Sequence, residues 1–288
     1  MKTFSTTPGN ERKRSVSCPV CGSQKGKNHA VFAESVFLRC SSCGLVYQNP
    51  QPWQEDLSLR YNTEYFDYER SHEEIFYNLM RLGLEDIDLA RVSWKLPRPR
   101  FFLDVGCATG RLLEALRDEG WETAGVELCE PSAEYGRTQR GLQIKSGTLE
   151  EAGFPDESFH IVHASHLVEH LTEPRLFLKE AFRILKPGGY VILVTPNTAG
   201  FQARLFGRAW RSLIEDHICL FSKQNLSLLL RKEGFVLHRI KTWGGLAQGT
   251  APGFLKKILD PWAKRFGFGD VMIVLAQKSS PGRVLTEK

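Results

Sequence analysis

Beyond residue 100 the chain alternates short apolar runs with amphipathic segments. The apolar runs end at glycine or at a polar residue, as strands do, and apolar positions in the intervening segments recur at helical spacing. The expected strands are 101–106, 121–128, 142–147, 159–165, 190–195, 235–243 and 270–278. The expected helices are 110–120, 131–140, 173–185 and 222–234. This alternation predicts an α/β fold in which helices cover both faces of a mostly parallel, seven-stranded sheet.

The first hundred residues fall into three segments of different composition. Residues 1–14 are polar and basic, and we expect a disordered tail. Residues 15–50 contain two closely spaced cysteine pairs and end at a turn-forming Asn-Pro-Gln-Pro. Residues 51–100 are expected to form a linker with lid helices, and the Pro-Arg-Pro-Arg at their end prevents helix continuation. The main domain is expected over 101–280, followed by a tail at 281–288.

Two features of the 51–100 segment bear on its role. Apolar side chains recur at helical spacing at Ile75, Leu79 and Leu82, which predicts a helix. Tyr61 and Tyr65 belong to an aromatic cluster that could cover a bound ligand or pack between the two domains. The sequence leaves both interpretations of this cluster open.

Composition and charge narrow the class of protein. The chain has 288 residues, of which 42% are hydrophobic and 25% charged, as is typical of a globular protein. It has no apolar run of about 18 residues and no secretory signal at its start, so we expect a cytoplasmic protein. Between Phe201 and Phe266, twelve Lys or Arg stand against four Asp or Glu. This basic stretch is either a solvated face or a contact for nucleic acid, a phosphorylated metabolite or a membrane surface.

Four of the seven cysteines are arranged as a metal site. Cys18-Pro-Val-Cys21-Gly and Cys40-Ser-Ser-Cys43-Gly are separated by eighteen residues. Two such turns bring four thiolates to one ion, which predicts a structural zinc ribbon over residues 15–50. A pair of redox dithiols is the alternative. So small a module needs its metal to fold, whereas we expect the main domain to have a core of its own.

A cofactor site is predicted where the first strand of the main domain meets its first helix. The run from Asp104 through Gly106 and Ala108 to Gly110 lets the backbone approach a ligand closely, and the helix start offers free N–H donors. Glu127 ends the second strand, where a carboxylate can accept hydrogen bonds from both hydroxyls of a ribose. A dinucleotide fingerprint would need its last glycine one position later, where arginine stands, so NAD fits less well.

Further segments match a known family in the same order: GTLEEAGFPDESFHIV, HLVEHLTEP, RILKPGGYVILVTPN and DHICLFSKQNLSLLLRKEGF. With these motifs the chain resembles class I S-adenosylmethionine-dependent methyltransferases over about residues 101–277, especially a bacterial subgroup that acts on small molecules and glycans. The resemblance implies a Rossmann-like fold and S-adenosylmethionine as cofactor. Ala108 replaces the usual middle glycine, and Thr148 stands where Asp often faces the adenine. The predicted cofactor contacts are Asp104, Gly106, Ala108, Gly110, Glu127, Leu128, Thr148, Leu149 and Ser165.

The candidate catalytic residues are the histidines that follow the fourth and fifth strands. His166 and His170 would share a face if the segment between them is helical. With Glu169 and a returning His217, they could provide a general base for the acceptor proton. The same set resembles the acidic-histidine metal site of certain quinone and RNA-end methyltransferases, so a second metal at Glu169, His170 and His217 is an alternative. A purely structural role for the histidines is the third.

The leading hypothesis for function is methylation of a small molecule, a glycan or a lipid-linked intermediate. A second is an RNA methyltransferase whose zinc ribbon and basic stretch contact phosphates. A third is a non-catalytic adaptor that carries a zinc ribbon on a degenerate methyltransferase fold. Residues 246–266 mix basic and aromatic side chains, and we expect them to cap the substrate pocket, with peripheral contact to a membrane as the alternative. The acceptor atom and the oligomeric state are not defined by the sequence.

Overall fold

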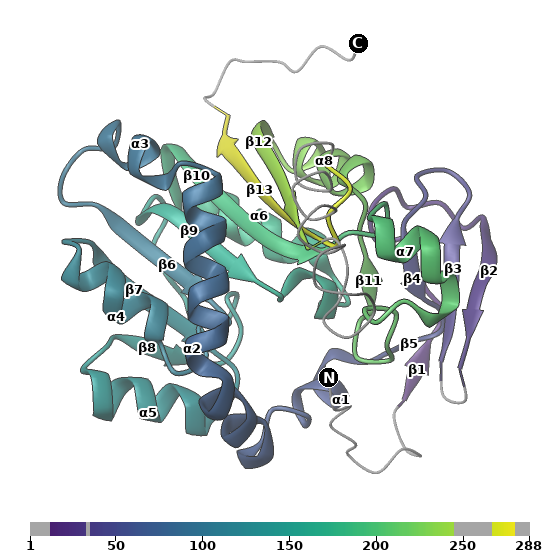
Figure 1. Cartoon of the computed structure of the whole chain (residues 1–288), viewed down its shortest axis with the longest axis horizontal. Helices are drawn as coiled ribbons and strands as arrows, with labels where there is room; N and C mark the ends of the chain where they lie inside the picture. Colours follow the sequence, from purple (N-terminus) through teal and green to yellow (C-terminus); the bar gives the residue numbers. More distant parts are fainter. Residues whose placement is uncertain (1–11, 33–34, 245–266, 280–288) are drawn as a thin grey trace, which may run out of the picture.

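The centre of the molecule is a seven-stranded sheet with helices on both faces (Figure 1). The computed structural model describes residues 12–32, 35–244 and 267–279. The strands are β6 (Phe101–Val105), β7 (Glu122–Glu127), β8 (Ile144–Ser146), β9 (Phe159–Ser165), β10 (Leu185–Pro196), β12 (Phe235–Trp243) and β13 (Val271–Lys278). Their order is β12-β13-β10-β9-β6-β7-β8, and β13 runs in the direction opposite to the other six strands. The predicted mostly parallel sheet is confirmed.

Two layers of helices cover the sheet because its strands are apolar on both faces. The helices are α1 (Gln54–Ser58), α2 (Thr63–Asp86), α3 (Leu89–Trp94), α4 (Arg111–Asp118), α5 (Glu130–Arg140), α6 (Pro174–Ile184), α7 (Phe201–Phe206) and α8 (Lys223–Lys232). Along β10, Ile192 and Val194 belong to the core under α2, α4 and α5. Val191 and Leu193 belong to the core under α6 and α8. The alternation of side chains along a strand thus supplies both cores.

Helix α2 lies across the face that also carries α4 and α5 (Figure 1). It confirms the helix predicted from Ile75, Leu79 and Leu82, although such spacing usually marks a buried face. These three side chains are instead 59%, 46% and 58% exposed. The helix packs through Leu84, its C-cap residue Ile87 and the partly buried Tyr77 and Met80, and ion pairs link it to α4 and α5.

The four-cysteine segment folds as a sheet that includes a strand from the main domain. Its strands are β2 (Gly26–Val31), β3 (Val36–Cys40), β4 (Val46–Gln48) and β11 (Cys219–Leu220), in the order β11-β4-β3-β2. β11 is antiparallel to β4, with Cys219 opposite Tyr47 and Leu220 opposite Val46. Trp210 lies in the same hydrophobic cluster as Val46 and Leu220. One buried cluster of the main domain, under α4, contains no residue of 15–50, as expected, but two other clusters include residues of both parts. The core of the main domain is therefore only partly its own.

Lys13 and Arg14, which composition placed in a disordered tail, form a strand. Strand β1 (Lys13–Arg14) pairs antiparallel with β5 (Gln51–Pro52). The Arg14 guanidinium lies 4.8 Å from the centroid of the Trp53 ring, and its Nη2 lies 3.0 Å from Glu173 Oε1. These contacts order residues that we expected to be disordered, so the prediction of a disordered tail up to residue 14 is corrected at its end.

Two further predictions lie outside the described residues. The proposed cap at 246–266 and the tail at 281–288 both fall in ranges that the structure does not describe. Among the helices of the described ranges, none combines the length and the apolar character that crossing a bilayer requires.

Candidate active site and metal centre

The loop between β6 and α4 has the backbone conformation of a ligand-binding turn. Gly106 and Gly110 have φ values of +72° and +78°, and Ala108, which replaces the usual glycine, is held at +48°. A methyl group at Gly110 would overlap the side chain of Leu142, so this end of the loop is tightly packed. Gly106 is exposed. The loop is thus anchored at one end and open at the other, where a cofactor can approach.

Glu127 ends β7 beside this loop and is 5% exposed. Its Oε2 accepts a hydrogen bond from the backbone N–H of Ala108 at 2.8 Å, and its Oε1 accepts one from Cys129, also at 2.8 Å. Burial raises the pKa of the Glu127 carboxyl to about 7, although these N–H groups favour the ionised form. The carboxylate is therefore fixed at the edge of the loop, where its remaining lone pairs suit the hydroxyls of a ribose.

Asp104 belongs to the interior rather than to the open side of the loop. It is 2% exposed, and its Oδ1 lies 2.7 Å from Nδ1 of the buried His163 on β9. This contact ties β6 to β9 beneath the loop. The sequence did not predict this contact, because no residue spacing indicates which side chain a single histidine on a strand will meet. A direct contact of Asp104 with the cofactor stays a prediction.

The remaining predicted cofactor contacts lie around the same edge of the sheet. Ser165 ends β9, and Leu128 directly follows β7; both are partly exposed. Thr148 donates to the carboxylate of Glu151 through its backbone N at 2.9 Å and its Oγ1 at 3.0 Å. Leu149 is buried, with 2% exposure. All four lie in or beside loops at the carboxyl ends of the strands, and their roles stay predictions.

Side chains from the start of α2 cover this edge. The rings of Tyr61 and Tyr65 lie edge to face at 75°, with centroids 5.0 Å apart. Burial raises the pKa of Tyr65 well above its usual value, and the nearby Glu69 carboxylate adds to the effect. Burial likewise raises the pKa of Tyr61, to which the charges of Glu127 and Glu169 contribute. The Asn62 carbonyl, next to Tyr61, lies 3.5 Å from Cys129 Sγ, directly after the predicted cofactor contacts Glu127 and Leu128, which supports the interpretation of this cluster as a cover.

Glu169, His170 and His217 come together at the carboxyl ends of β9 and β10. Glu169 and His170 lie in a short 3-10 helix after β9, and His217 precedes β11. One potential ligand atom from each lies within 4.8 Å of the others. Glu169 Oε2 accepts a hydrogen bond from Thr195 Oγ1 at 2.9 Å. Glu169 and His170 are adjacent in the sequence and His217 is distant, yet the three are neighbours in the fold, as predicted.

His166 occupies a different position from the other two histidines. Its backbone φ is +52° and its side chain is 48% exposed. Its Nδ1 lies 3.1 Å from Glu169 Oε1, so it contacts the cluster from the solvent side. The predicted shared helical face of His166 and His170 is wrong, because the 3-10 helix begins only at Val168.

The electrostatics of the cluster fix which groups carry charge at neutral pH. Burial would raise the pKa of Glu169, but the hydrogen bond and charge of His166, with the other two imidazoles, lower it to about 2. Burial lowers the pKa of His217 to about 4 and also lowers that of His170. The cluster therefore presents a carboxylate beside two neutral imidazoles. That set can accept a proton, and it can also ligate a divalent cation.

The four cysteines of the zinc ribbon converge as predicted. Cys18 Sγ lies 3.5 Å from Cys43 Sγ, and Cys21 Sγ lies 3.5 Å from Cys40 Sγ. Sulfurs bound about 2.3 Å from one tetrahedral zinc lie about 3.8 Å apart, so the sulfurs fit the ion with little movement. Backbone N–H groups outweigh the effect of burial at Cys40 and lower the pKa of its thiol to about 7. The site fits zinc without an open position for substrate.

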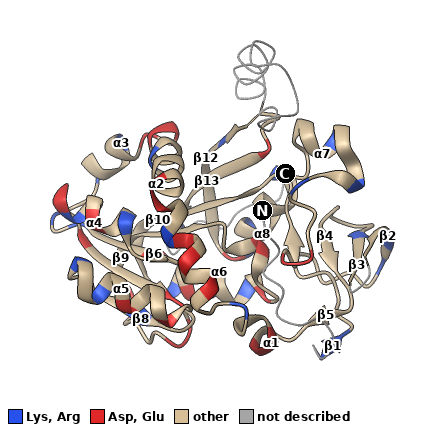
Figure 2. Ribbon diagram, turned by 60° about the horizontal axis from the view of Figure 1, so that its bottom comes forward, with Lys and Arg blue, Asp and Glu red and all other residues tan. Residues whose placement is uncertain are grey.

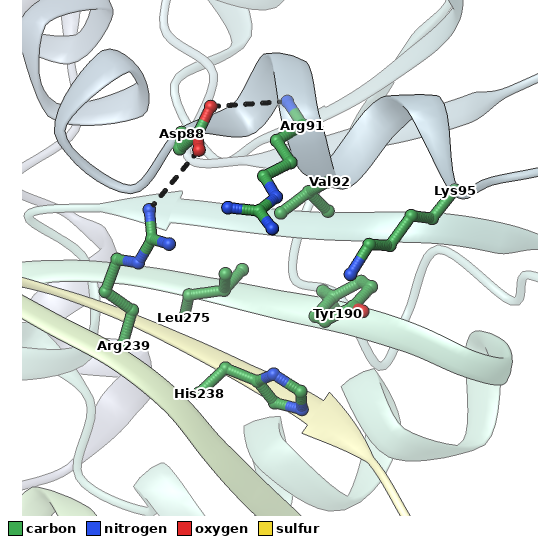
Figure 3. A pocket seen from close by; sticks show the side chains of 8 residues that line it. All are labelled: Asp88, Arg91, Val92, Lys95, Tyr190, His238, Arg239 and Leu275. Atoms are coloured by element: carbon green, nitrogen blue, oxygen red, sulfur yellow. Dashed lines mark hydrogen bonds and ion pairs between the residues drawn. The ribbon is translucent and has the colours of Figure 1, made fainter.

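Two hollows on the described surface lie away from these sites. One of about 260 Å³ is formed under α3 by side chains of β10, β12 and β13 (Figure 3). Its rim carries Arg91, Lys95 and Arg239, and Tyr190 contributes to its floor. Tyr190 lies in the first half of β10, whereas the cofactor loop and the histidines lie at the carboxyl ends of the strands. We therefore do not place the reaction in this hollow.

The fold and the two sites define a class I S-adenosylmethionine-dependent methyltransferase, to which a four-cysteine module is attached. A protein-family model described as a methyltransferase domain matches residues 77–240. The chain belongs to this family.

Curated relatives match this chain over only part of its length. A ubiquinone biosynthesis O-methyltransferase of Idiomarina loihiensis is 34% identical over 101 residues, which cover 33% of this chain and 42% of the relative. One of Pseudomonas fluorescens is 29% identical over 124 residues, covering 40% and 53%. The chain thus spans about half the length of the curated relatives it matches.

Solved structures share the fold over a larger part of the chain. An S-adenosylmethionine-dependent methyltransferase from Thermotoga maritima, described as a possible histamine N-methyltransferase, is 27% identical with a TM-score of 0.54. The match covers 74% of this chain and 95% of that one. A methyltransferase from Archaeoglobus fulgidus, 21% identical with a TM-score of 0.52, covers 74% and 99% and shows the fold alone.

Proposed function

We propose that this chain transfers the methyl group of S-adenosylmethionine to a hydroxyl oxygen of a small molecule. The observation that carries the proposal is the pair of neutral imidazoles, His170 and His217, beside the carboxylate of Glu169. A hydroxyl must lose its proton as it is methylated, and this set can accept one. Two of the similar curated proteins are named as O-methyltransferases, which supports the same acceptor chemistry.

In the proposed mechanism, residues along the carboxyl edge of the sheet have separate roles. The open end of the loop at Gly106 and the carboxylate of Glu127 would hold the cofactor, with Tyr61 and Tyr65 covering it. The cofactor, when bound, supplies a methyl group on a cationic sulfur. His170 or His217 takes the proton of the acceptor hydroxyl, and Glu169 stabilises the imidazolium that results. Transfer would join the acceptor oxygen to the methyl carbon, and the cofactor would be released as an uncharged thioether.

The finer description of the acceptor is part of the proposal. We include glycans and lipid-linked intermediates in the acceptor class, with a cytoplasmic location and peripheral contact with a membrane. An amine would need no base once it is unprotonated, so the dependence on the histidines distinguishes a hydroxyl from a nitrogen acceptor. This contrast matters because the similar Thermotoga protein is described as a possible histamine N-methyltransferase, which acts on nitrogen.

One observation supports the RNA alternative. The strands β1, β2 and β3 carry Lys13, Arg14, Lys27 and Arg39 and no acidic residue within their bounds, as the charge colouring shows (Figure 2). Phosphates are bound mainly by such side chains. We keep this function second, because Arg14 is already paired with Glu173.

The proposal is tested with S-adenosylmethionine that carries a radioactive methyl group. Purified protein is incubated with matched acceptors: a catechol and its amine analogue, a lipid-linked sugar, and a structured RNA. We expect label on the hydroxyl compound, and we expect His170→Ala and His217→Ala to lose most of it. Label on the amine with both variants active would exclude the hydroxyl mechanism. Label on the RNA would favour the second function. Cofactor binding with no turnover on any acceptor would favour the adaptor.

A further inference from the structure

The zinc ribbon is bonded to the part of the chain that carries His217. Strand β4, which begins three residues after Cys43, pairs with β11, which begins two residues after His217. β11 is an edge strand of the ribbon sheet and not of the seven-stranded sheet. Strand β4 therefore connects the metal centre to the acceptor site.

Gln48 makes the central contact of this connection. Its side chain is buried, and its Nε2 donates to the carbonyl of Glu215 at 2.6 Å and to the carbonyl of His217 at 3.1 Å. Its backbone N–H donates to the carbonyl of Ile218 at 2.9 Å. A single glutamine thus holds a four-residue turn at three carbonyls.

The carbonyl of Asp216 is the one in this turn that Gln48 does not contact, and it is directed at the histidine cluster. His170 Nδ1 lies 2.9 Å from it. The side of the turn that faces the ribbon is further held by Ser35, whose Oγ donates to Glu215 Oε1 at 3.0 Å. The backbone N–H of Ile218 donates to the carbonyl of Glu169 at 2.7 Å. The turn therefore lies between the ribbon on one side and Glu169 and His170 on the other.

We propose that the zinc ribbon is a structural half of the acceptor site, in which Gln48 is a positioning residue that orients His170 and His217 by fixing the turn at 215–218. The catalytic consequence rests on the proposed function; the positioning itself does not. Because His170 bonds to the turn and His217 belongs to it, a displaced turn moves both imidazoles. A displacement of about 1 Å at a reacting group lowers turnover by about a hundredfold.

The chain offers a matched control for this inference. Gln51 is also a buried glutamine of the ribbon region, with 1% exposure, and its Nε2 has no hydrogen-bond partner among the described residues. Gln48→Leu and Gln51→Leu both replace a buried amide by an apolar side chain of similar size. Gln48→Leu alone removes the two bonds to the turn.

The test uses the full, zinc-loaded chain with ¹⁵N-labelled histidine. In both variants we expect unchanged zinc content and unchanged affinity for S-adenosylmethionine, whose predicted contacts lie elsewhere. The imidazole nitrogen resonances of His170 and His217, assigned by replacing each in turn, should shift or broaden in Gln48→Leu and stay in place in Gln51→Leu. Turnover should fall tenfold to a hundredfold in Gln48→Leu alone. Imidazole resonances in Gln48→Leu that match the wild type would overturn the inference.

Two further experiments separate loss of zinc from loss of the Gln48 contacts. If Gln48→Leu loses zinc, Gln48→Asn keeps an amide that is too short to reach both carbonyls, and it is expected to shift the same resonances. Removing zinc from the wild-type chain with a chelator should also disturb both imidazoles, and unchanged resonances would contradict the inference. The resonances are read without any acceptor, so failure to find methyl transfer leaves this test intact.

Discussion

His170 and His217 lie edge to face, with ring centroids 4.8 Å apart. Each ring directs its Nδ1 at a backbone carbonyl: that of Asp216 at 2.9 Å for His170, and that of Ser212 at 2.7 Å for His217. Because a carbonyl only accepts, each Nδ1 carries the ring proton and each Nε2 keeps its lone pair. The pair is therefore set to accept a proton, and both Nδ1 atoms are held by backbone carbonyls.

Replacing either imidazole should slow the chemical step without weakening cofactor binding. We expect His170→Ala or His217→Ala to lower turnover by about 10²–10⁴, the usual contribution of a general base. Dissociation constants for S-adenosylmethionine should change little, because neither ring lies at the loop of Gly106. Steady-state kinetics and calorimetry check the two quantities separately. Normal turnover in both variants would mean that the histidines are structural.

The pH dependence of turnover should show how far the pKa of the catalytic base is lowered. Burial lowers the pKa of His217 to about 4 and also lowers that of His170, and a base works in its unprotonated form. Turnover at saturating cofactor should therefore persist below pH 6.5, the usual pKa of histidine, and fall only at more acidic pH. A midpoint at or above pH 6.5 would contradict the burial argument.

The competing interpretation of the same cluster is a second metal. A chelator used under conditions that leave the four-thiolate zinc in place should not change turnover if the imidazoles act as bases. The matched measurement is turnover after adding back Mg²⁺ or Mn²⁺, with bound metal counted per chain. Loss of activity on chelation that is restored by one of these ions would identify Glu169, His170 and His217 as metal ligands.

Metal content should also confirm the zinc ribbon. We expect one zinc per chain, and Cys40→Ser should lose the ion because a closed tetrahedral site needs all four thiolates. Since the ribbon shares a sheet with β11, the loss should destabilise the main domain as well, which thermal unfolding would show. Elemental analysis that finds no zinc in the wild type would reject the site. A Cys107→Ser variant is the control, because Cys107 lies outside the ribbon.

Two glycines allow a paired test of the cofactor loop. Gly110 and Gly120 have similar φ values of +78° and +85°, but a methyl group would overlap Leu142 at Gly110 and meet nothing within 4 Å at Gly120. Gly120→Ala should cost about 1–2 kcal/mol of unfolding free energy from backbone strain alone. Gly110→Ala should cost about 1–3 kcal/mol more from overpacking. Urea unfolding measures both, and equal losses would contradict the packing of this loop.

The sequence predicted the parts of the fold that depend on local pattern. The loop through Gly106, the carboxylate at Glu127 and the cysteine spacing each follow from a short segment whose geometry is set by its own residues. The role of Gln48 has no such signal, because its partners are 167 and 169 residues away and an isolated glutamine has no pattern. Helical spacing likewise could not show that Ile75 and Leu79 face solvent, because ion pairs anchor that part of α2.

Binding of S-adenosylmethionine should strengthen as the pH rises. The pKa of Glu127 is raised to about 7 by burial, and only the ionised carboxylate can accept from both ribose hydroxyls. Below pH 7 binding must release a proton, so affinity should rise by about tenfold per pH unit and level off above pH 7. Calorimetry in two buffers of different ionisation enthalpy counts the protons. Glu127→Gln should remove the slope, and a slope that persists would assign it to another group.

The most direct test of the central claim is calorimetric titration of S-adenosylmethionine into wild type and Glu127→Ala at pH 8. We predict one site per chain in the wild type, with NAD giving no heat of binding. The variant should bind more weakly by about 1.5–3 kcal/mol, the contribution of hydrogen bonds to a charged group, which is about tenfold to a hundredfold in Kd. Equal affinities for the two proteins, or no binding to the wild type, would contradict the assignment of this edge of the sheet as the cofactor site.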